Sequence, residues 1–269
     1  MTLDPVPGSL RQAALQALQI ADPAAKAQAA QQLLQAARAG RLRPDPGLDL
    51  AEPAGLPGRP PRPRLVPPKQ VPTRSVHTPQ GRAALLHAVA HIEFNAINLA
   101  LDAVWRFAGL PEAYYLDWAQ VAGEEALHFG LLSAHLATLD HRYGDFDAHD
   151  GLWTMTELTK HDPLARMALV PRTLEARGLD ATPPMQAKLA AAGDTAAVAI
   201  LDIILRDEIG HVAIGNRWYR WLCQRDGIDA EAAYPELVQR YAAPRLRPPF
   251  NHPARRAAGF SEQELQSLG

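Results

Sequence analysis

The sequence has little of several features that would assign it to a common class of protein. It contains one cysteine, Cys223, among its 269 residues. A single cysteine excludes an intrachain disulfide and a cysteine-based zinc site, and it fits a reducing, cytoplasmic compartment. The start of the chain lacks the basic-then-apolar pattern of an export signal. No unbroken apolar run approaches about 18 residues, so we expect neither export nor a membrane span.

Neither sign of charge dominates, and proline is scarce in the middle of the chain. The formal net charge is -2, so nothing draws the whole protein toward nucleic acid or a membrane surface. Of the 24 prolines, 11 lie within residues 41–80, and a second group lies near the C-terminus. The alanine- and leucine-rich middle therefore predicts helices, and the flanks predict extended arms.

The first proline-rich arm is basic. It carries several cations and no acid between its first and last: Arg59, Arg62, Arg64, Lys69 and Arg74. Such a segment is either an ordered strap on the domain surface or a phosphate-binding strip for nucleic acid. We favour the strap, because the arm has no aromatic side chains on which bases could stack.

Hydrophobic periodicity predicts helices along most of the remaining chain. Two short helices are expected within residues 9–39, broken at Pro23. Pro171 should kink the third core helix or open a bulge in it. The long connection 142–162 contains a short helical piece, and another short helix is expected over 185–192. The core helices are predicted over residues 79–109, 111–141, 163–178 and 195–227.

Two of these helices contain the same short pattern. Glu125 precedes His128 by three residues, and Glu208 precedes His211 by three residues. Residues three apart lie on one face of a helix, so each pair can reach one metal ion. Both pairs lie in long apolar segments, where a carboxylate is costly unless it is paired or bound to metal.

Each pattern also has a glutamate in the preceding helix, at a matched distance. Glu93 lies 32 residues before Glu125, and Glu175 lies 33 residues before Glu208. The middle of the chain is therefore a duplicated helical hairpin. Glu175 is near a predicted helix end, so Glu157 is an alternative, but the matched spacing favours Glu175.

Together the two hairpins supply four carboxylates and two imidazoles. This is the ligand set of ferritin-like di-iron and di-manganese proteins. Four carboxylates balance the charge of two divalent metals. Oxygen ligands with one imidazole per metal favour iron or manganese over copper or structural zinc. The predicted ligands are Glu93, Glu125, His128, Glu175, Glu208 and His211.

Other polar residues are predicted to support these ligands. Glu124 and Asp207 each lie four residues before a histidine. They are candidates to accept an imidazole N–H, or are simply acids on the helix surface. Arg172 in the third core helix is expected to join a buried ion network with Asp202 and Arg206.

Four stretches of the sequence resemble the bacterial ferritin-like proteins of the DUF455 family. They are HAVAHIEFNAINLALDAVWRF, DWAQVAGEEALHF, LARMALVPRTLEARGLD and ILRDEIGHVAIGNRWY. The likeness covers about residues 79–227 and extends to the Pro-Phe-Asn stretch at 249–251. The resemblance implies a four-helix bundle with a dinuclear metal site held by the six residues above. It implies no reaction, because a fold alone does not supply one.

We therefore predict an all-α protein built on a ferritin-like four-helix bundle with a long crossover connection. The bundle spans residues 79–227. An N-terminal helical appendage (1–40) and the proline-rich basic arm (41–78) precede it. A C-terminal arm with a short helix (228–269) follows it.

The leading functional hypothesis is a di-iron oxidoreductase that activates O2 or peroxide. It would act on a small-molecule substrate and take electrons from a donor, with manganese as the alternative metal. One alternative is a ferroxidase or metal-handling protein without an organic substrate. Another is an enzyme like the ferritin-like tRNA hydroxylases, which the basic arms would serve. A third is a metal-stabilised scaffold without catalysis.

Overall fold

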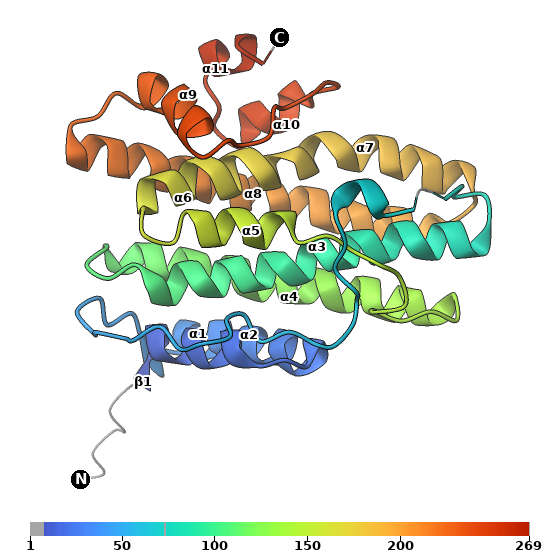
Figure 1. The fold of residues 1–269 in the computed structure, drawn as a ribbon, viewed down its shortest axis with the longest axis horizontal. Helices are drawn as coiled ribbons and strands as arrows, with labels where there is room; N and C mark the ends of the chain where they lie inside the picture. Colours follow the sequence, from blue (N-terminus) through green and yellow to red (C-terminus); the bar gives the residue numbers. More distant parts are fainter. Residues whose placement is uncertain (1–7, 73, 269) are drawn as a thin grey trace. The chain divides into compact units, whose positions relative to one another are not determined.

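The computed structural model describes residues 8–72 and 74–268, and its described part is mostly helical (Figure 1). Residues 1–7 of the predicted appendage, residue 73 of the first arm and residue 269 of the C-terminal arm lie outside it. The all-α class is confirmed. Two short strands, β1 (Gly8–Ser9) and β2 (Leu42–Arg43), pair in parallel. The ferritin-like arrangement of the helices stays a prediction.

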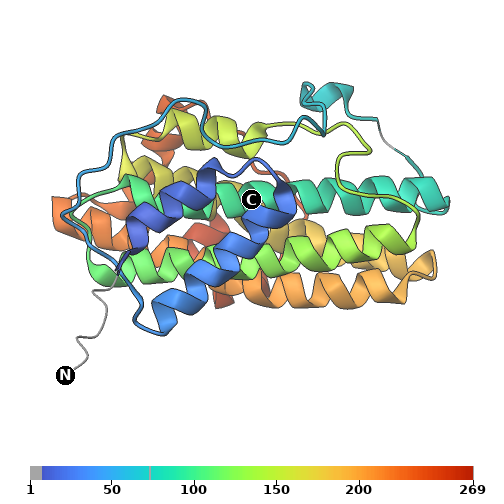
Figure 2. The ribbon, with the colours of Figure 1, turned by 90° about the horizontal axis from the view of Figure 1, so that it is seen from below.

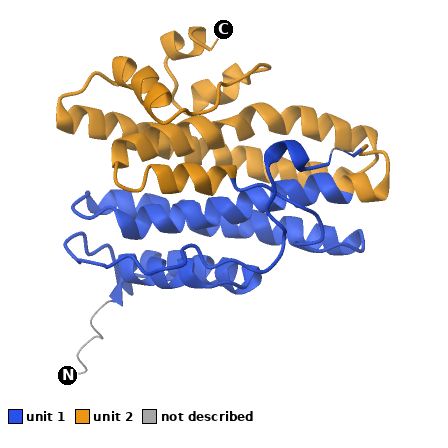
Figure 3. Ribbon diagram, viewed as in Figure 1, with its two compact units in different colours: residues 1–74, 83–150 blue, residues 75–82, 151–269 orange. Residues whose placement is uncertain are grey.

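The chain divides into two compact units (Figure 3). Unit 1 comprises residues 1–74 and 83–150, and unit 2 comprises residues 75–82 and 151–269. Each unit contains one of the two predicted Glu-x-x-His helices. The four predicted domain boundaries stay a prediction.

Unit 1 is built on two long helices with two shorter ones beside them. Asp22 caps the second short helix by accepting the N–H of Ala25, and Pro23 begins it, so the predicted break at this proline is confirmed. The short helix α2 packs on α4 (Figure 2). The helices are α1 (Leu10–Gln19), α2 (Pro23–Arg38), the 3-10 turn η1 (Pro68–Gln70), α3 (Pro79–Arg106) and α4 (Glu112–Thr138).

A glycine sets the close approach of α2 to α4. A Cβ atom on Gly123 would lie 2.5 Å from a methyl carbon of Leu34. Only glycine therefore lets α2 pack this closely against α4, two residues before the Glu-x-x-His pattern begins.

The helix α3 is apolar on nearly every face. By length and composition it could cross a membrane, and 78% of its most apolar 18-residue window is buried inside the protein. A buried core helix passes the same test, so α3 is weak evidence for a span. The sequence prediction considered unbroken apolar runs. α3 has a high mean hydropathy although polar residues interrupt it, and the sequence predicted it as a core helix.

The basic arm of unit 1 is an ordered strap, as favoured from the sequence. Arg59 pairs with Asp150 at 2.8 Å, and Arg64 pairs with Asp147 at 2.6 Å. Directly after Arg64, the strap forms a parallel bridge from Leu65 to Ala148, whose carbonyl accepts the backbone N–H of Val66 at 2.8 Å. Two of the five cations thus already have carboxylate partners within unit 1.

Unit 2 contains the remaining helices, and its third core helix is irregular. Pro171 lies in a π-helical turn, which confirms the predicted bulge. Proline has no N–H to donate to the carbonyl four residues earlier, and its ring clashes with the preceding turn. The helix therefore adopts the wider π-helical turn there. The elements are α5 (Gly151–Leu158), α6 (Pro163–Leu169), η2 (Val170–Glu175), α7 (Ala176–Ala191), α8 (Thr195–Asp226), α9 (Ala230–Arg240), α10 (His252–Ala257) and α11 (Glu262–Gln266).

The predicted end of the third core helix at Gly178 is wrong. The helix α7 continues through Gly178 and Pro183, so no separate helix begins near residue 185. Pro183 cannot donate to the carbonyl of Leu179 four residues earlier. Asn251 Nδ2 donates to that carbonyl instead, at 3.1 Å. A contact from far along the chain thus lets the helix pass Pro183. The helices α9 and α10 were not predicted either.

Candidate metal centre

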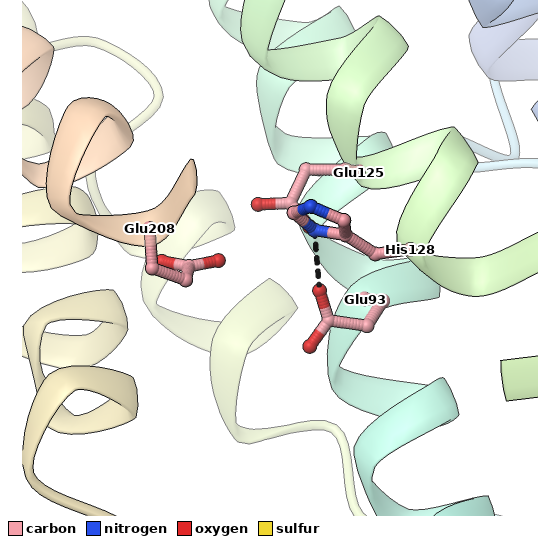
Figure 4. Close-up of side chains that lie close together, drawn as sticks. All are labelled: Glu93, Glu125, His128 and Glu208. Atoms are coloured by element: carbon pink, nitrogen blue, oxygen red, sulfur yellow. Dashed lines mark hydrogen bonds and ion pairs between the residues drawn. The ribbon is translucent and has the colours of Figure 1, made fainter. Parts of the chain in front are cut away.

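The first half of the predicted site is assembled within unit 1 (Figure 4). Glu93 comes from the middle of α3, and Glu125 and His128 come from one face of α4. His128 Nδ1 lies 3.2 Å from Glu93 Oε2 and 3.3 Å from Glu125 Oε2. The three side chains are 4%, 0% and 0% exposed, in that order. Each offers a ligand atom within 4.8 Å of the others, which is compact enough to surround one metal ion.

Burial perturbs the charges of this group strongly. Burial and the charge of Glu125 raise the pKa of Glu93 to about 8. Burial lowers the pKa of His128, but its hydrogen bonds to Glu125 and Glu93 outweigh that effect and raise the pKa to about 11. A proton shared among these side chains thus supplies the positive charge that a metal cation would otherwise supply. Metal binding would release this proton.

An aromatic cluster in unit 1 includes the residues that follow two of these ligands in sequence. Phe94 and Phe129 follow Glu93 and His128 in sequence, and their rings lie 5.4 Å apart. The ring of Tyr143 closes against both, at 5.4 Å and 5.1 Å. Its hydroxyl is hydrogen-bonded to His91 Nδ1 at 2.9 Å. The cluster thus packs the connection after α4 against α3 and α4.

The second half repeats the same local geometry within unit 2. Glu208 and His211 lie on one face of α8 and are 7% and 1% exposed. His211 Nδ1 lies 3.5 Å from Glu208 Oε1. Glu208 Oε2 has no hydrogen-bond partner among the described residues. A buried carboxylate oxygen in this state is costly, and a cation would remove the cost.

Glu175 is the remaining predicted ligand in unit 2. It is the last residue of the π-helical turn η2 and is 7% exposed. The alternative, Glu157, has a side chain that is 43% exposed and pairs with Lys160 at 2.6 Å. Burial thus agrees with the spacing argument in favouring Glu175.

The protein therefore contains buried carboxylates and a histidine that could hold metal. In unit 1 this group consists of Glu93, Glu125 and His128 (Figure 4).

The predicted supporting residues have partners of their own. Glu124 accepts a hydrogen bond from Gln120 at 3.0 Å. Asp207 pairs with its exposed neighbour Arg206 at 2.8 Å. Arg172 is buried and donates to Asn216 at 2.7 Å. Their predicted support of the metal ligands stays a prediction.

The predicted buried ion network of Arg172 with Asp202 and Arg206 is wrong. Asp202 is exposed and accepts from Gln186 at 2.5 Å. The Arg206 side chain is 70% exposed. Both residues lie on the outer face of α8, because the 3.6-residue period turns them away from the face that carries His211.

Two residues that contact α3 were missed from the sequence. Tyr143 follows α4 in a connection that has no periodic signal. Lys26 is a lone lysine in an alanine-rich helix, yet it is fully buried and donates to Asn98 Oδ1 at 2.5 Å. Burial and the charge of Arg59 lower the pKa of Lys26 to about 7. No local pattern marks either residue, because only the packing of α2 and the connection brings them to α3.

The fold and the buried group of unit 1 define a mostly helical protein that could hold metal. The chain belongs to the family described as "Protein of unknown function (DUF455)", whose model matches residues 19–266. It is 55% identical over 213 residues to an "Uncharacterized protein" of Haemophilus influenzae, covering 77% of this chain and 74% of that relative. No solved structure matches the chain. The resemblance noted in the sequence is thus confirmed.

Proposed function

We propose that the two halves form one dinuclear iron centre and that the protein is an oxidoreductase activating O2 or peroxide. One observation carries the proposal. In each unit a buried histidine Nδ1 faces the carboxylate three residues earlier, at 3.3 Å in unit 1 and 3.5 Å in unit 2. Each unit also holds one further buried glutamate at a matched distance along the chain. A duplicated half-site is what a two-metal centre requires.

The donor set fits two iron ions better than other common metals. Six predicted donors divide into two carboxylates and one imidazole per metal, and carboxylates prefer hard cations. The charge of four carboxylates would be balanced by two divalent ions. Manganese fits the same donors and is the second choice.

The chain's own residues would position and shield the reaction. Bound iron would supply the capacity to reduce O2 or peroxide. Glu93, with its raised pKa, can hold a proton whenever a cation does not neutralise it. Phe94 and Phe129 pack together on the helices that carry Glu93 and His128, and with Tyr143 they would add apolar shielding there. A small organic substrate and an external electron donor complete the proposal.

The same proposal includes the fold and the compartment. A ferritin-like bundle of α3, α4, the irregular helix η2–α7 and α8 would place all six donors at one centre. The long connection containing α5 would serve as its crossover. A reducing, cytoplasmic location suits both ferrous iron and the free, buried Cys223.

The test begins with metal stoichiometry. The purified protein is loaded anaerobically with Fe(II), and bound iron is counted after removal of the excess. We expect two iron ions per chain in the wild type and in a Glu157→Gln control. At most one ion per chain would overturn the dinuclear centre.

The second step separates the oxidoreductase from metal handling. O2 is added to the loaded protein together with a chemical reductant. Absorption of oxidised iron, with reductant consumed over many turnovers, supports the oxidoreductase. Oxidation of two irons followed by iron release and no further turnover would support a ferroxidase instead.

A further inference from the structure

The C-terminal residues 251–264 of unit 2, here called the clasp, hold the chain on both sides of Glu175. The clasp contains α10 and the start of α11. Three residues before Glu175 it contacts Arg172, and five residues after Glu175 it contacts Asp180. Sequence patterns assign the clasp no role.

On the first side, Arg172 is buried within the π-helical turn and depends on the clasp. Its guanidinium lies 4.9 Å from the ring centres of three aromatic residues and forms an ion pair with Glu264. Glu264 also accepts from the backbone N–H of Ser261 at 2.7 Å and from Arg220 at 3.2 Å. The three rings are those of Tyr219, Tyr234 and Phe260.

On the second side, Asp180 in α7 is bound by two residues of the clasp. Arg255, which is fully buried, donates to both carboxylate oxygens of Asp180, at 3.0 Å and 2.6 Å. The backbone N–H of Asn251 donates to Asp180 Oδ1 at 2.8 Å. Arg255 also reaches the carbonyl of Ala176, the residue that follows Glu175, at 3.4 Å. A planar guanidinium that donates two hydrogen bonds to one carboxylate fixes the orientation of the two groups as well as their distance.

Apolar packing joins the same parts. One buried cluster contains residues of α7 and α8 together with residues of the clasp and of α11. The clasp is therefore part of the core of unit 2 rather than a loose tail. The cluster consists of Ala176, Leu179, Val212, Ala254, Ala258, Phe260 and Leu265.

We propose that the clasp is the positioning element of Glu175, with Arg172 and Glu264 as its positioning residues. This inference rests on the proposed metal centre. A π-helical turn lacks the regular hydrogen-bond ladder that would fix Glu175 by local geometry. The turn is instead anchored through Arg172 and α7 through Asp180, so the backbone that carries Glu175 is held between two ion pairs.

The position of Glu175 should depend most on the ion pair between Arg172 and Glu264. A buried guanidinium without its carboxylate is strongly unfavourable, so Arg172 would move toward water once Glu264 lost its charge. The turn would move with it. Displacement of a ligand by about 1 Å is enough to loosen a metal site.

The test measures iron binding to the full chain after Glu264→Gln. The matched control is Glu262→Gln, which removes the exposed partner of Arg256 on the same helix. We expect Glu264→Gln to lower the affinity for one of the two iron ions by about 10- to 100-fold. The affinity for the other ion should not change. The control should bind both as the wild type does. Faster hydrogen exchange at residues 170–178 should accompany the loss.

The outcomes separate the clasp from the proposed function. Two irons bound with wild-type affinity by Glu264→Gln would overturn the clasp alone. Fewer than two irons in the wild type would overturn the metal centre and the clasp with it. If Glu264→Gln does not fold, Arg172→Lys is measured instead. Lysine keeps the positive charge but lacks the planar guanidinium that can bind a carboxylate through two N–H groups. Unchanged affinity in that variant would equally overturn the positioning role.

Discussion

The two halves of the candidate site hold the same kinds of side chain by different means. In unit 1, Glu93 lies in the middle of a regular helix, buried among apolar neighbours. In unit 2, Glu175 ends a π-helical turn that contains Pro171. The other members agree closely, because Glu125 with His128 and Glu208 with His211 repeat one helical spacing.

The difference shows which parts of a duplicated site can diverge. A glutamate in a regular helix is oriented by its own backbone ladder and needs only a packed neighbour. A glutamate at an irregular turn needs contacts from elsewhere, and here the residues around it are bound by the C-terminal clasp. The two halves can thus have the same kinds of donor side chain although only the half in unit 2 depends on contacts from a distant part of the chain.

The largest expected effect comes from removing a donor from either half. Each of the variants Glu125→Ala and Glu208→Ala should lose the binding of one iron ion per chain. The affinity for the remaining ion should fall by more than about 100-fold. Loss of a supporting residue alone costs about 10- to 100-fold in other metal sites, and loss of a ligand costs more. Equilibrium dialysis against Fe(II) under argon measures both numbers.

Neighbouring acids provide the controls for these variants. Glu124→Gln and Asp207→Asn alter the residue directly before each ligand and should retain two irons, with affinity lowered by at most about 100-fold. If Glu208→Ala still bound two irons, the assignment of unit 2 would be wrong while that of unit 1 stood. The halves would then not be a duplicated site.

The next effect is the pH dependence of the metal-free protein, which arises in unit 1. The pKa of Glu93 is raised from 4.5 to about 8, so its contribution to stability falls as pH rises between these values. The pKa of His128 is raised from 6.5 to about 11, so the stability it adds below 6.5 is also lost as pH rises. Denaturant unfolding should show a loss on the order of 1 kcal/mol per pH unit between pH 6 and 9.

Bound metal should reverse this dependence. A cation binds the deprotonated ligands, so the protein with saturating metal should gain stability relative to the metal-free form as pH rises. The variant Glu93→Gln should show a shallower slope without metal. An unchanged slope in that variant would mean that Glu93 does not hold the proton.

The sequence was informative where a local pattern coincided with structure. Capping and proline positions located α1, α2 and α8, and the spacing of Glu125 and His128 placed them on one buried face. Pro171 marked the bulge, because a missing N–H acts on the turn that contains it.

Features that depend on distant contacts were not visible. The helix α7 passes Pro183 because Asn251, 72 residues away from Leu179, donates to the freed carbonyl. Arg172 was expected in an ion network with Asp202 and Arg206, but its carboxylate partner is Glu264, 92 residues along the chain. No periodicity within a short window encodes such pairs, so the clasp could be found only in the folded chain.

A smaller effect is expected from restoring the regular helix beneath Glu175. Pro171→Ala supplies an N–H, which would let residues 170–175 return to α-helical register and rotate Glu175 about the helix axis. Affinity for one iron should fall by about tenfold, with the other iron unaffected. The control is Pro184→Ala, at an exposed position of the neighbouring helix α7. Equal affinity in both variants would show that the π-helical turn does not set the ligand position.

The smallest effect is expected from the strap of unit 1, which resembles the clasp only superficially. Both are proline-containing segments bound by arginine–carboxylate pairs. However, the Arg64 side chain is 75% exposed, whereas that of Arg172 is 3% exposed. An exposed pair is screened by water and contributes little, and the backbone bridge of the strap to Ala148 remains without it. Arg64→Gln should therefore leave iron affinity within about twofold of the wild type, measured in the same dialysis as Glu264→Gln. If Arg64→Gln weakened iron binding as much as Glu264→Gln does, both halves would depend on outside segments, and the contrast between a self-supported and a clasped glutamate would be lost.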